Sequence, residues 1–289
     1  MRIAVTGASG YLGGQIVDHL RGEGHEVLPL SRAGVDGPPF SLGEPFPAAS
    51  LRGVSVVVHA AWDFAARDDE VRTRNVGGAL PLLDAAASEG ARIVHISSLS
   101  AHHGCRSRYG AAKLALEELV ALRGGCSLRP GLVYGPTLGG LFGTIAGAVG
   151  RLPALPVPTA RRVSRIFLSD DRTLSAVVLA LATTGVVPEG PVFAAHASPL
   201  TLTSLVRRIA AARGRHVATV PLPCATTYHL LHLLEAAGLR PGFRADSLLA
   251  IADPVPISEL ARLSPSPVAF GELDFAATLG PSARPPTAR

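Results

Sequence analysis

The sequence predicts an α/β protein built on a doubly wound parallel sheet, with a smaller, partly helical C-terminal domain. Three observations predict this fold. Short apolar runs alternate with amphipathic stretches, a glycine cluster follows the first run, and the sequence becomes rich in glycine and proline after Gly135. Strands that alternate with helices of this length form a parallel sheet covered on both faces. A chain of 289 residues can bury such a sheet.

The elements follow in order along the chain. Apolar runs predict buried strands, and amphipathic stretches predict the helices between them. The strands are 2–6, 27–30, 54–59, 92–96, 126–128 and 166–168, and the helices are 15–21, 76–88, 108–122, 171–181, 202–212 and 226–237. Residues 135–160 read as a loop-rich insertion that forms a lid or a pocket wall. A loop-rich tail closes the chain, with frayed residues at 281–289.

Composition limits the partners. The net charge of +5 comes from arginines scattered along the chain, which favours a solvated surface and argues against nucleic-acid binding. Three cysteines stand far apart without a C-x-x-C pair, so we expect no disulfide framework, no metal site and a reducing, cytoplasmic compartment. The sequence begins directly with a strand-like run and has no apolar run of about 18 residues, so we expect no leader and no membrane span.

The glycine cluster lies between the first strand and the first helix. Gly7 allows a tight turn, Gly10 lets the backbone approach a pyrophosphate, and Gly13 permits close packing of the helix on the strand. The helix N-terminus then faces the anion. A plain turn before a helix is the alternative, but the position directly after an N-terminal strand favours a dinucleotide site. We assign 1–135 and 165–196 to a dinucleotide-binding Rossmann domain, and 136–164 and 197–289 to a substrate-binding domain and tail.

The end of the second strand predicts which dinucleotide binds. Folds of this kind place an acid there to hold the ribose 2′-hydroxyl of NAD. This chain has Ser31 and Arg32, a hydroxyl and a guanidinium that suit a 2′-phosphate. The sequence therefore predicts NADP(H), with NAD(H) ranked below it. The alternative for Arg32 is a solvated loop arginine.

Tyr109 and Lys113 form a third motif. Four residues apart on a predicted helix, they share one face and can address a common site. A lysine charge favours the phenolate and lowers the tyrosine pKa from about 10, which lets tyrosine give or take a proton. Lys113 is the only lysine in the chain, which suggests a position where arginine would not serve. Ser98, at a strand end upstream, could hold a carbonyl oxygen beside Tyr109.

Taken together, these motifs resemble the extended short-chain dehydrogenase/reductases, the NAD(P)-dependent epimerase/dehydratase group. The resemblance runs in order over residues 1–136 and continues faintly through 167–171. It rests on Thr6 to Gly13, His59-Ala60-Ala61, Asn75 to Gly78, Ile96-Ser97-Ser98, Tyr109 to Lys113 and Leu128 to Pro136.

The resemblance implies a role for each matching residue. Tyr109 would be the acid/base, Lys113 would bind the nicotinamide ribose and tune Tyr109, and Ser98 would orient the substrate carbonyl, with Ser97 as a lower-ranked alternative. Asn75 would support the site, and the segment from Pro130 to Val133 would pass beside the nicotinamide. The cofactor-binding set is Gly7, Ser9, Gly10, Tyr11, Leu12, Gly13, Ser31, Arg32, Ala60, Ala61, Asn75, Lys113, Pro130 and Val133.

Two departures from the family pattern bear on the reaction. Sugar-nucleotide dehydratases of the family follow the catalytic Ser/Thr with Asp-Glu, whereas Leu99 and Ser100 stand here, which disfavours dehydration. An arginine that the sugar-nucleotide enzymes use for the substrate diphosphate is replaced by Val163. Arg161, Arg162 and Arg165 lie close enough in sequence to leave diphosphate binding open.

Weaker candidates would line the substrate pocket. They are Trp62, Phe64, Ser100, His102 and Tyr134. Trp62 and Phe64 follow a strand at the edge where ligands bind, although packing explains them equally well. His102 and His103 are adjacent on a loop and lack a third ligand at metal spacing, so we favour solvated histidines over pocket residues. The helices 76–88 and 108–122 could pair with a second subunit, as in the family, or simply cover the sheet.

The function that these features predict is NADP(H)-dependent reduction of a ketone or aldehyde on a small or medium-sized metabolite. A nucleotide-sugar epimerase or ketoreductase is the second hypothesis, which the modest chain length disfavours. A protein that senses NADP(H) without catalysis is the third. Sensors derived from this fold usually lose the tyrosine or the lysine, and this chain keeps both.

Overall fold

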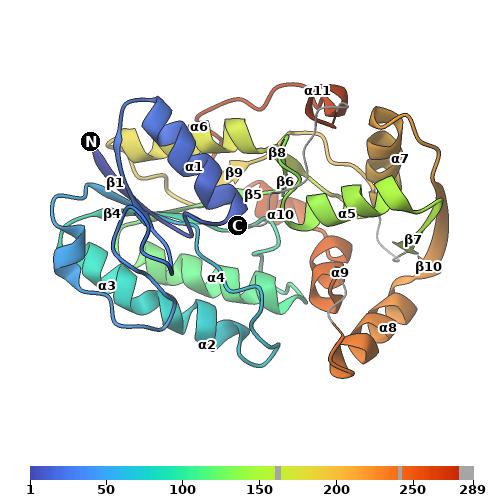
Figure 1. Ribbon diagram of the computed structural model, residues 1–289, viewed down its shortest axis with the longest axis horizontal. Helices are drawn as coiled ribbons and strands as arrows, with labels where there is room; N and C mark the ends of the chain where they lie inside the picture. Colours follow the sequence, from blue (N-terminus) through green and yellow to red (C-terminus); the bar gives the residue numbers. More distant parts are fainter. Residues whose placement is uncertain (160–163, 240–242, 280–289) are drawn as a thin grey trace.

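A six-stranded parallel sheet forms the centre of the computed structural model, which describes residues 1–159, 164–239 and 243–279 (Figure 1). Its strand order is β2-β1-β3-β4-β5-β9. The strands are β1 (Arg2–Thr6), β2 (Glu26–Leu30), β3 (Val56–His59), β4 (Arg92–Ile96), β5 (Cys126–Pro130) and β9 (Val192–Ala194). The predicted α/β fold with a doubly wound parallel sheet is confirmed.

Helices cover both faces of this sheet. One face carries α1 (Tyr11–Gly22) and α6 (Asp171–Thr183), and the other carries α3 (Leu80–Ser88) and α4 (Arg108–Ala121), with the short α2 (Val71–Asn75) beside α4 (Figure 1). The central strands β1 and β3 are buried on both faces, so their sequences are nearly continuous apolar runs rather than alternating ones. Ile3, Val5 and Val58 pack on one side, and Ala4 and Val57 on the other.

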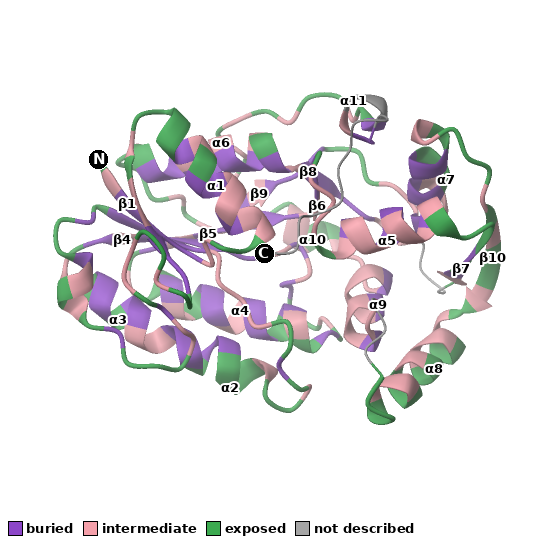
Figure 2. Ribbon diagram, in the orientation of Figure 1, coloured by how far each residue is buried: buried purple, intermediate pink, exposed green. Residues whose placement is uncertain are grey.

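The rest of the chain forms small parallel pairs and helices beyond the carboxyl edge of the sheet. The strand β6 (Leu132–Tyr134) pairs with β8 (Leu168–Asp170), and β7 (Ala154–Thr159) pairs with β10 (Ala218–Pro223). The helices of this part are α5 (Gly140–Arg151), α7 (Leu202–Ala212), α8 (Cys224–Ala236), α9 (Ala245–Ala252), α10 (Ile257–Leu260) and α11 (Phe275–Leu279). Burial falls off outward, since none of the residues of α8 is buried (Figure 2). All six sheet strands fall within 1–135 and 165–196, while the division into two domains stays a prediction.

The predicted loop-rich insertion at 135–160 is wrong, because this segment contains α5 and β7. Glycines usually disfavour helices, but here burial outweighs that cost. Phe142, Ile145 and Val149 lie on one face of α5 and pack into a core with α7. At Gly143 a side chain would collide with the carbonyl oxygen of Leu138, 2.4 Å from an added Cβ.

Two further boundaries differ from prediction. The helix predicted at 76–88 begins only at Leu80, because Gly77–Ala79 forms a short 3-10 turn and Pro81 lies in the first turn of the α-helix, where a missing N–H costs nothing. The tail predicted as loop-rich contains α9, α10 and α11. The predicted fraying at 281–289 lies outside the described residues. Within the described part of the chain, no helix combines the length and the apolar character needed to span a bilayer.

Candidate active site

The carboxyl ends of β1, β3 and β4 meet at one edge of the sheet, where the glycine turn leads into α1. Gly7 has φ +66°, which favours glycine, and a Cβ there would lie 2.9 Å from the Cα of Ala61. Thr6 organises this edge, since its hydroxyl accepts hydrogen bonds from the backbone N–H groups of Ala60 and Ala61, each at 3.1 Å. The turn therefore packs against the end of β3.

The start of α1 fits a phosphate group. Gly10 is the N-cap and supplies no side-chain cap, and the first turn contains no acidic residue. A Cβ at Gly13 would lie 2.1 Å from the carbonyl oxygen of Gly7, so only glycine lets the helix sit this close to the strand. Ser9 and Gly10 are exposed beside it. Uncapped backbone N–H groups at a helix N-terminus attract an anion, so this turn suits a dinucleotide pyrophosphate.

Tyr11 and Leu12 open the helix, and the Tyr11 side chain has a structural task. Its hydroxyl donates a hydrogen bond to the Asp171 carboxylate at 2.9 Å, which ties α1 to α6. Burial and this carboxylate raise the pKa of Tyr11. Its ring lies so close to Gly139 that a Cβ there would approach the ring to 2.4 Å. Leu12 packs with the core on the α1 face of the sheet.

Ser31 and Arg32 follow β2, as predicted. Ser31 is buried, and its carbonyl oxygen accepts hydrogen bonds from the backbone N–H groups of Gly34 and Phe40, which closes a turn. Arg32 is exposed and forms no ion pair with any residue that the structure describes. A free guanidinium at this strand end suits a phosphate on the adenosine ribose.

Tyr109, on the first turn of α4, lies among side chains from two other segments. The Ser98 hydroxyl donates a hydrogen bond to its oxygen. The Trp62 ring meets the Tyr109 ring edge to face at 5.2 Å, and the Phe64 ring stacks on it at 6.3 Å. Phe64 is 70 % exposed, so it forms the outer side of this cluster. The sequence motifs at 62–64, 98 and 109 therefore come together around one hydroxyl.

Lys113 lies one turn further along α4 and is almost completely buried. Its Nζ donates a hydrogen bond to the Ile96 carbonyl oxygen at 2.7 Å and lies 4.1 Å from the Trp62 ring centroid. Burial lowers the pKa of Lys113 to about 7, and the Glu117 carboxylate opposes this shift. An ammonium has three donors, so this amine can take further acceptors such as ribose hydroxyls.

The pKa of Tyr109 moves in the direction opposite to the one expected from the sequence. Burial raises it to about 12, the Ser98 hydrogen bond opposes the rise, and the Asp246 carboxylate adds to it. Loss of hydration disfavours the phenolate. Lys113 does not offset this, because its own burial disfavours its charge as well. Tyr109 is therefore protonated near neutral pH.

Asn75 and Ser97 support the site from behind. The Asn75 side chain accepts from the Asp63 N–H at 2.6 Å and donates to the Val71 carbonyl oxygen at 3.1 Å, which fixes the loop that carries Trp62. Ser97 is buried and its hydroxyl donates to the Glu117 carboxylate. Because Ser97 is engaged there, the hydroxyl that faces Tyr109 belongs to Ser98.

Sequence reasoning missed three sets of contacts around the site. Both carboxylate oxygens of Glu117 accept hydrogen bonds from the Arg129 guanidinium, at 2.8 Å and 2.7 Å, in a buried ion pair. His59 and His95 stack at 5.6 Å between centroids, buried in adjacent strands, and burial lowers the pKa of each. Asp246 of α9 accepts hydrogen bonds from the first backbone N–H groups of α4. No sequence motif signalled these tertiary contacts, except that buried charges need partners.

The remaining predicted residues divide between the site and the core. Pro130 is buried at the end of β5, and its carbonyl oxygen accepts from the Leu99 N–H at 2.9 Å. Val133 packs on the sheet core. Ser100 follows the serine turn, and its N–H donates to the Ser98 oxygen at 3.1 Å. The structure gives Tyr134 a core position in place of the predicted pocket position, since it is buried with its hydroxyl 2.9 Å from His196.

The two loop histidines separate, as adjacent residues on a loop should. His103 is exposed, as favoured by the sequence. The prediction of a solvated His102 is wrong: its ring is 3 % exposed, with Nδ1 3.2 Å from the His103 carbonyl oxygen and Nε2 3.4 Å from that of Asp253. The approach of α9 buries it. Val163, Arg161 and Arg162 lie outside the described residues, and Arg165 donates to the Val255 carbonyl oxygen at 3.0 Å.

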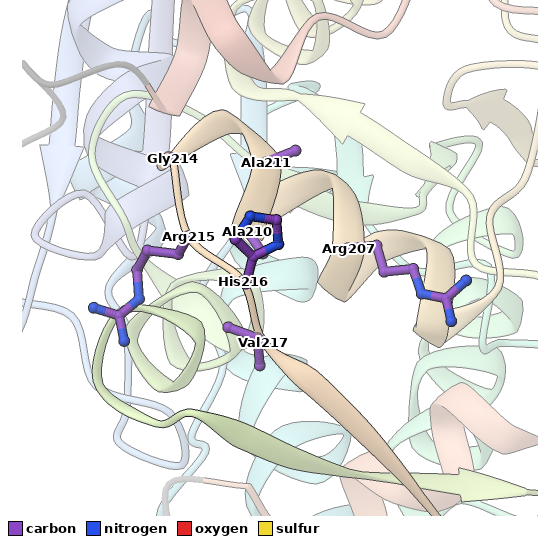
Figure 3. A pocket seen from close by; sticks show the side chains of 7 residues that line it. All are labelled: Arg207, Ala210, Ala211, Gly214, Arg215, His216 and Val217. Atoms are coloured by element: carbon purple, nitrogen blue, oxygen red, sulfur yellow. The ribbon is translucent and has the colours of Figure 1, made fainter.

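A hollow of about 550 Å³ lies elsewhere, at the C-terminal end of α7. Figure 3 shows Arg207 and Arg215 extending in opposite directions around it, with His216 between them. Ala210, Ala211, Gly214 and Val217 complete its lining. It contains none of the predicted site residues, so it is separate from the candidate active site. Among the described residues, no cluster of three or more His, Cys, Asp or Glu side chains could hold a metal ion.

A glycine turn at the head of a parallel sheet, with serine, tyrosine and lysine side chains at the same edge, defines an extended short-chain dehydrogenase/reductase. Residues 3–185 match the NAD dependent epimerase/dehydratase family. The chain belongs to this family, and its fold and site motifs are those of an oxidoreductase-type enzyme.

Relatives in sequence are of two kinds. An uncharacterized protein of Mycobacterium tuberculosis is 36% identical over 253 residues, which cover 83% of this chain and 27% of the relative. The chain thus spans about a quarter of the length of that protein. A ceramide reductase of Caulobacter vibrioides is 35% identical over 187 residues, covering 58% of this chain and 57% of the relative.

Solved structures share the fold at lower identity. A short-chain dehydrogenase/reductase superfamily protein of Agrobacterium tumefaciens with bound NAD is 21% identical, with a TM-score of 0.64 over 91% of this chain and 99% of that one. A Thermus thermophilus UDP-glucose 4-epimerase in complex with NAD is 20% identical, with a TM-score of 0.61 over 87% of this chain and 97% of that one.

Proposed function

We propose that the protein is an NADP(H)-dependent reductase that converts a ketone or aldehyde of a small or medium-sized metabolite to the alcohol. The observation that carries this proposal is the cluster of Ser98, Tyr109 and Lys113 at the carboxyl edge of the sheet, beside a glycine turn that fits a dinucleotide. The 35% identity to a ceramide reductase supports reduction as the direction.

The protonation state of Tyr109 also supports reduction. A carbonyl that receives a hydride needs a proton on its oxygen, so the catalytic tyrosine must hold one beforehand. With a pKa raised to about 12, Tyr109 holds its proton throughout the neutral range. A general base for alcohol oxidation would need the phenolate, which burial disfavours here.

Each residue has a separate task in this mechanism. Bound NADPH would supply the hydride. The Ser98 and Tyr109 hydroxyls would both donate hydrogen bonds to the carbonyl oxygen, where negative charge develops, and Tyr109 would then transfer its proton to that oxygen. Lys113 would hold the ribose hydroxyls next to Tyr109. The Trp62 and Phe64 rings would exclude water and bind the apolar part of the substrate.

The choice of NADP(H) over NAD(H) rests on Arg32. It is exposed at the end of β2, is without a carboxylate partner in the described chain, and can form charge-assisted hydrogen bonds to a 2′-phosphate. We expect a cytoplasmic enzyme with a small-molecule carbonyl or hydroxyl substrate. Pairing with a second copy through helices α3 and α4 stays a prediction.

The decisive experiment measures turnover and cofactor binding in Tyr109→Phe. The purified protein is assayed with NADPH against a panel of ketones, aldehydes, ceramide and UDP-sugars. The parent should reduce a carbonyl compound, and Tyr109→Phe should lose about 10²- to 10⁴-fold in turnover while binding NADPH as the parent does. Parental turnover in this variant would exclude the mechanism. Epimerisation of a UDP-sugar would favour the nucleotide-sugar hypothesis, and tight NADPH binding without turnover of any compound would favour a sensor.

A second experiment tests the cofactor assignment. Titration of the parent should give tighter binding of NADPH than of NADH, and Arg32→Asp should abolish or reverse this preference because a carboxylate repels the 2′-phosphate and accepts from a ribose hydroxyl. Arg52→Asp, on an exposed loop below the opposite edge, serves as the matched charge control. Equal affinities of the parent for the two dinucleotides would contradict the role of Arg32.

A further inference from the structure

The first three backbone N–H groups of helix α4 have no carbonyl oxygen of their own helix to donate to, which is the usual state of a helix N-terminus. Ser107, the N-cap, accepts from the Gly110 N–H at 3.0 Å. The other two N–H groups, of Arg108 and Tyr109, donate to the two carboxylate oxygens of Asp246, at 2.8 Å and 3.0 Å. A residue 137 positions away therefore completes the cap of the helix that carries the candidate proton donor.

Asp246 reaches this place from the first turn of α9, in the C-terminal part of the chain. Its carboxylate lies at the N-terminal ends of both α4 and α9, where helix dipoles favour a negative charge. The helix α9 is held in turn by α8, because the Glu235 carboxylate accepts from the Ala245 N–H at 2.9 Å. The C-terminal helices thus connect, through two carboxylates, to the backbone of Tyr109 itself.

We propose that Asp246 is a positioning residue, whose carboxylate holds the first turn of α4 and through it the place of the Tyr109 hydroxyl beside Ser98. The proposal rests on the function proposed above, in which Tyr109 is the proton donor. Backbone N–H groups held by both oxygens of one carboxylate fix the helix end in position and direction. A displaced first turn would move the hydroxyl away from Ser98, and a small misplacement of a reacting group lowers the rate steeply.

Charge supports the same conclusion. The negative charge of Asp246 contributes to the raised pKa of Tyr109, since it disfavours a second negative charge on the phenolate. The charges that act on Asp246 are those of Asp68, in the loop before α2, and Arg244, at the N-cap of α9, whereas Arg108 and Tyr109 reach it through backbone N–H groups. The Cys105 thiol also lies within the field of Asp246. The Ser98 hydroxyl bonds to the Tyr109 oxygen, and the Lys113 Nζ lies 5.9 Å from the centroid of the Tyr109 ring. Removing the charge of Asp246 should therefore make Tyr109 more acidic.

Asp253 is a matched control on the same helix. It follows the last turn of α9 and its carboxylate accepts from the backbone N–H of Arg106 at 2.9 Å, two residues before α4 begins. Asp253 accepts no hydrogen bond from Tyr109, and its charge is not among the causes that shift the pKa of Tyr109. A purely structural role in docking α9 should be shared by Asp246 and Asp253, whereas an effect on Tyr109 should belong to Asp246 alone.

The test is a spectroscopic titration of tyrosinate in the full-length protein, without substrate. The chain has four tyrosines, so subtracting the titration of Tyr109→Phe isolates Tyr109. We expect its midpoint to move to lower pH in Asp246→Asn and to stay at the parental value in Asp253→Asn. An unmoved midpoint in folded Asp246→Asn, or equal shifts in the two variants, would overturn the proposal. Because this readout needs neither cofactor nor turnover, it stands even if the protein proves not to be a reductase.

Kinetics with the identified substrate provide the second readout. Asp246→Asn should lower kcat more than it changes KM. It should also move the alkaline limb of the pH–rate profile to lower pH. Asp246→Glu keeps the charge but lengthens the side chain, so it should keep the parental titration midpoint with a reduced kcat. If Asp246→Asn does not fold, Asp246→Glu decides the question. A parental kcat in Asp246→Glu, with either a displaced or a parental titration midpoint of Tyr109, would contradict the positioning role.

Discussion

Two charged side chains lie one turn apart on α4 and are both buried, yet their surroundings differ. Glu117 is 6 % exposed, and its carboxylate has a full set of hydrogen-bond donors. Arg129 donates to both oxygens, and the Ser97 hydroxyl donates a third hydrogen bond. Lys113 is 3 % exposed, with one described hydrogen bond, to a backbone carbonyl oxygen, and one contact with an aromatic ring. The same helix therefore carries one buried charge that is fully paired and one that is not.

The difference separates stability from chemistry. A saturated buried ion pair holds its neighbours in place and has no capacity left for a ligand. A buried amine with unused donors and a pKa lowered to about 7 can respond to what binds beside it. We therefore expect substitutions at the two positions to affect different measurements.

The largest effect should follow from Lys113→Met. Loss of the amine removes the proposed ribose contact and the charge next to Tyr109, so turnover should fall by about 10²- to 10⁴-fold, with weaker NADPH binding. The variant should stay folded, because the buried charge that it removes is not part of an ion pair in the described structure. Activity within a factor of a few of the parent would remove Lys113 from the mechanism. The contrast between a functional Lys113 and a structural Glu117 would then fail.

The second effect concerns folding. Glu117→Gln leaves the buried Arg129 guanidinium with a neutral amide and the more distant Glu259 carboxylate, at 3.6 Å, which should cost about 3 kcal/mol in the free energy of unfolding, measured by chemical denaturation. The neighbouring Glu118 is exposed, so Glu118→Gln should change stability by less than about 0.5 kcal/mol. Turnover per folded molecule should stay close to parental in Glu118→Gln. Equal stabilities of the two variants would mean that the buried pair does not hold α4 on the sheet.

The smallest effect is a dependence of stability on pH. An unfolded lysine has a pKa of about 10.4, whereas that of folded Lys113 is about 7. Between these values the unfolded chain holds a proton that the folded chain lacks, so this group makes stability rise with pH. Below about pH 7 both states are protonated and the contribution is constant.

Thermal and chemical unfolding of the parent and of Lys113→Met at pH 7, 8 and 9 measures this dependence. The difference in unfolding free energy, parent minus variant, should increase with pH by up to about 1.4 kcal/mol per unit. Effects of other groups cancel in the difference. If the difference does not change over this range, Lys113 is hydrated and its proton affinity is ordinary.

How much the sequence predicts depends on how local each feature is. The strands β1 to β5 and the helix α4 follow from periodicity, and Ser98, Tyr109 and Lys113 follow from spacing within one segment. The helix α5 was not predicted, because its glycines suggest loops and only the packing of Phe142 and Val149 shows why it forms. The role of Asp246 could not be predicted, because it depends on a contact across 137 residues. The raised pKa of Tyr109 likewise reflects burial, which motif spacing does not report.

The position of β9 has a consequence for how the chain must be handled and how it folds. This strand, at 192–194, pairs with β5 and ends the six-stranded sheet, although about 60 residues separate the two in sequence and the family match stops at residue 185. A chain that ended at residue 185 would leave β5 as a bare edge, ready to pair with another molecule. During synthesis the same edge stays open until β9 has left the ribosome, and non-local parallel pairing is slow. The strand β9 therefore acts as the protein's own protection against aggregation, and expression limits should be drawn beyond it.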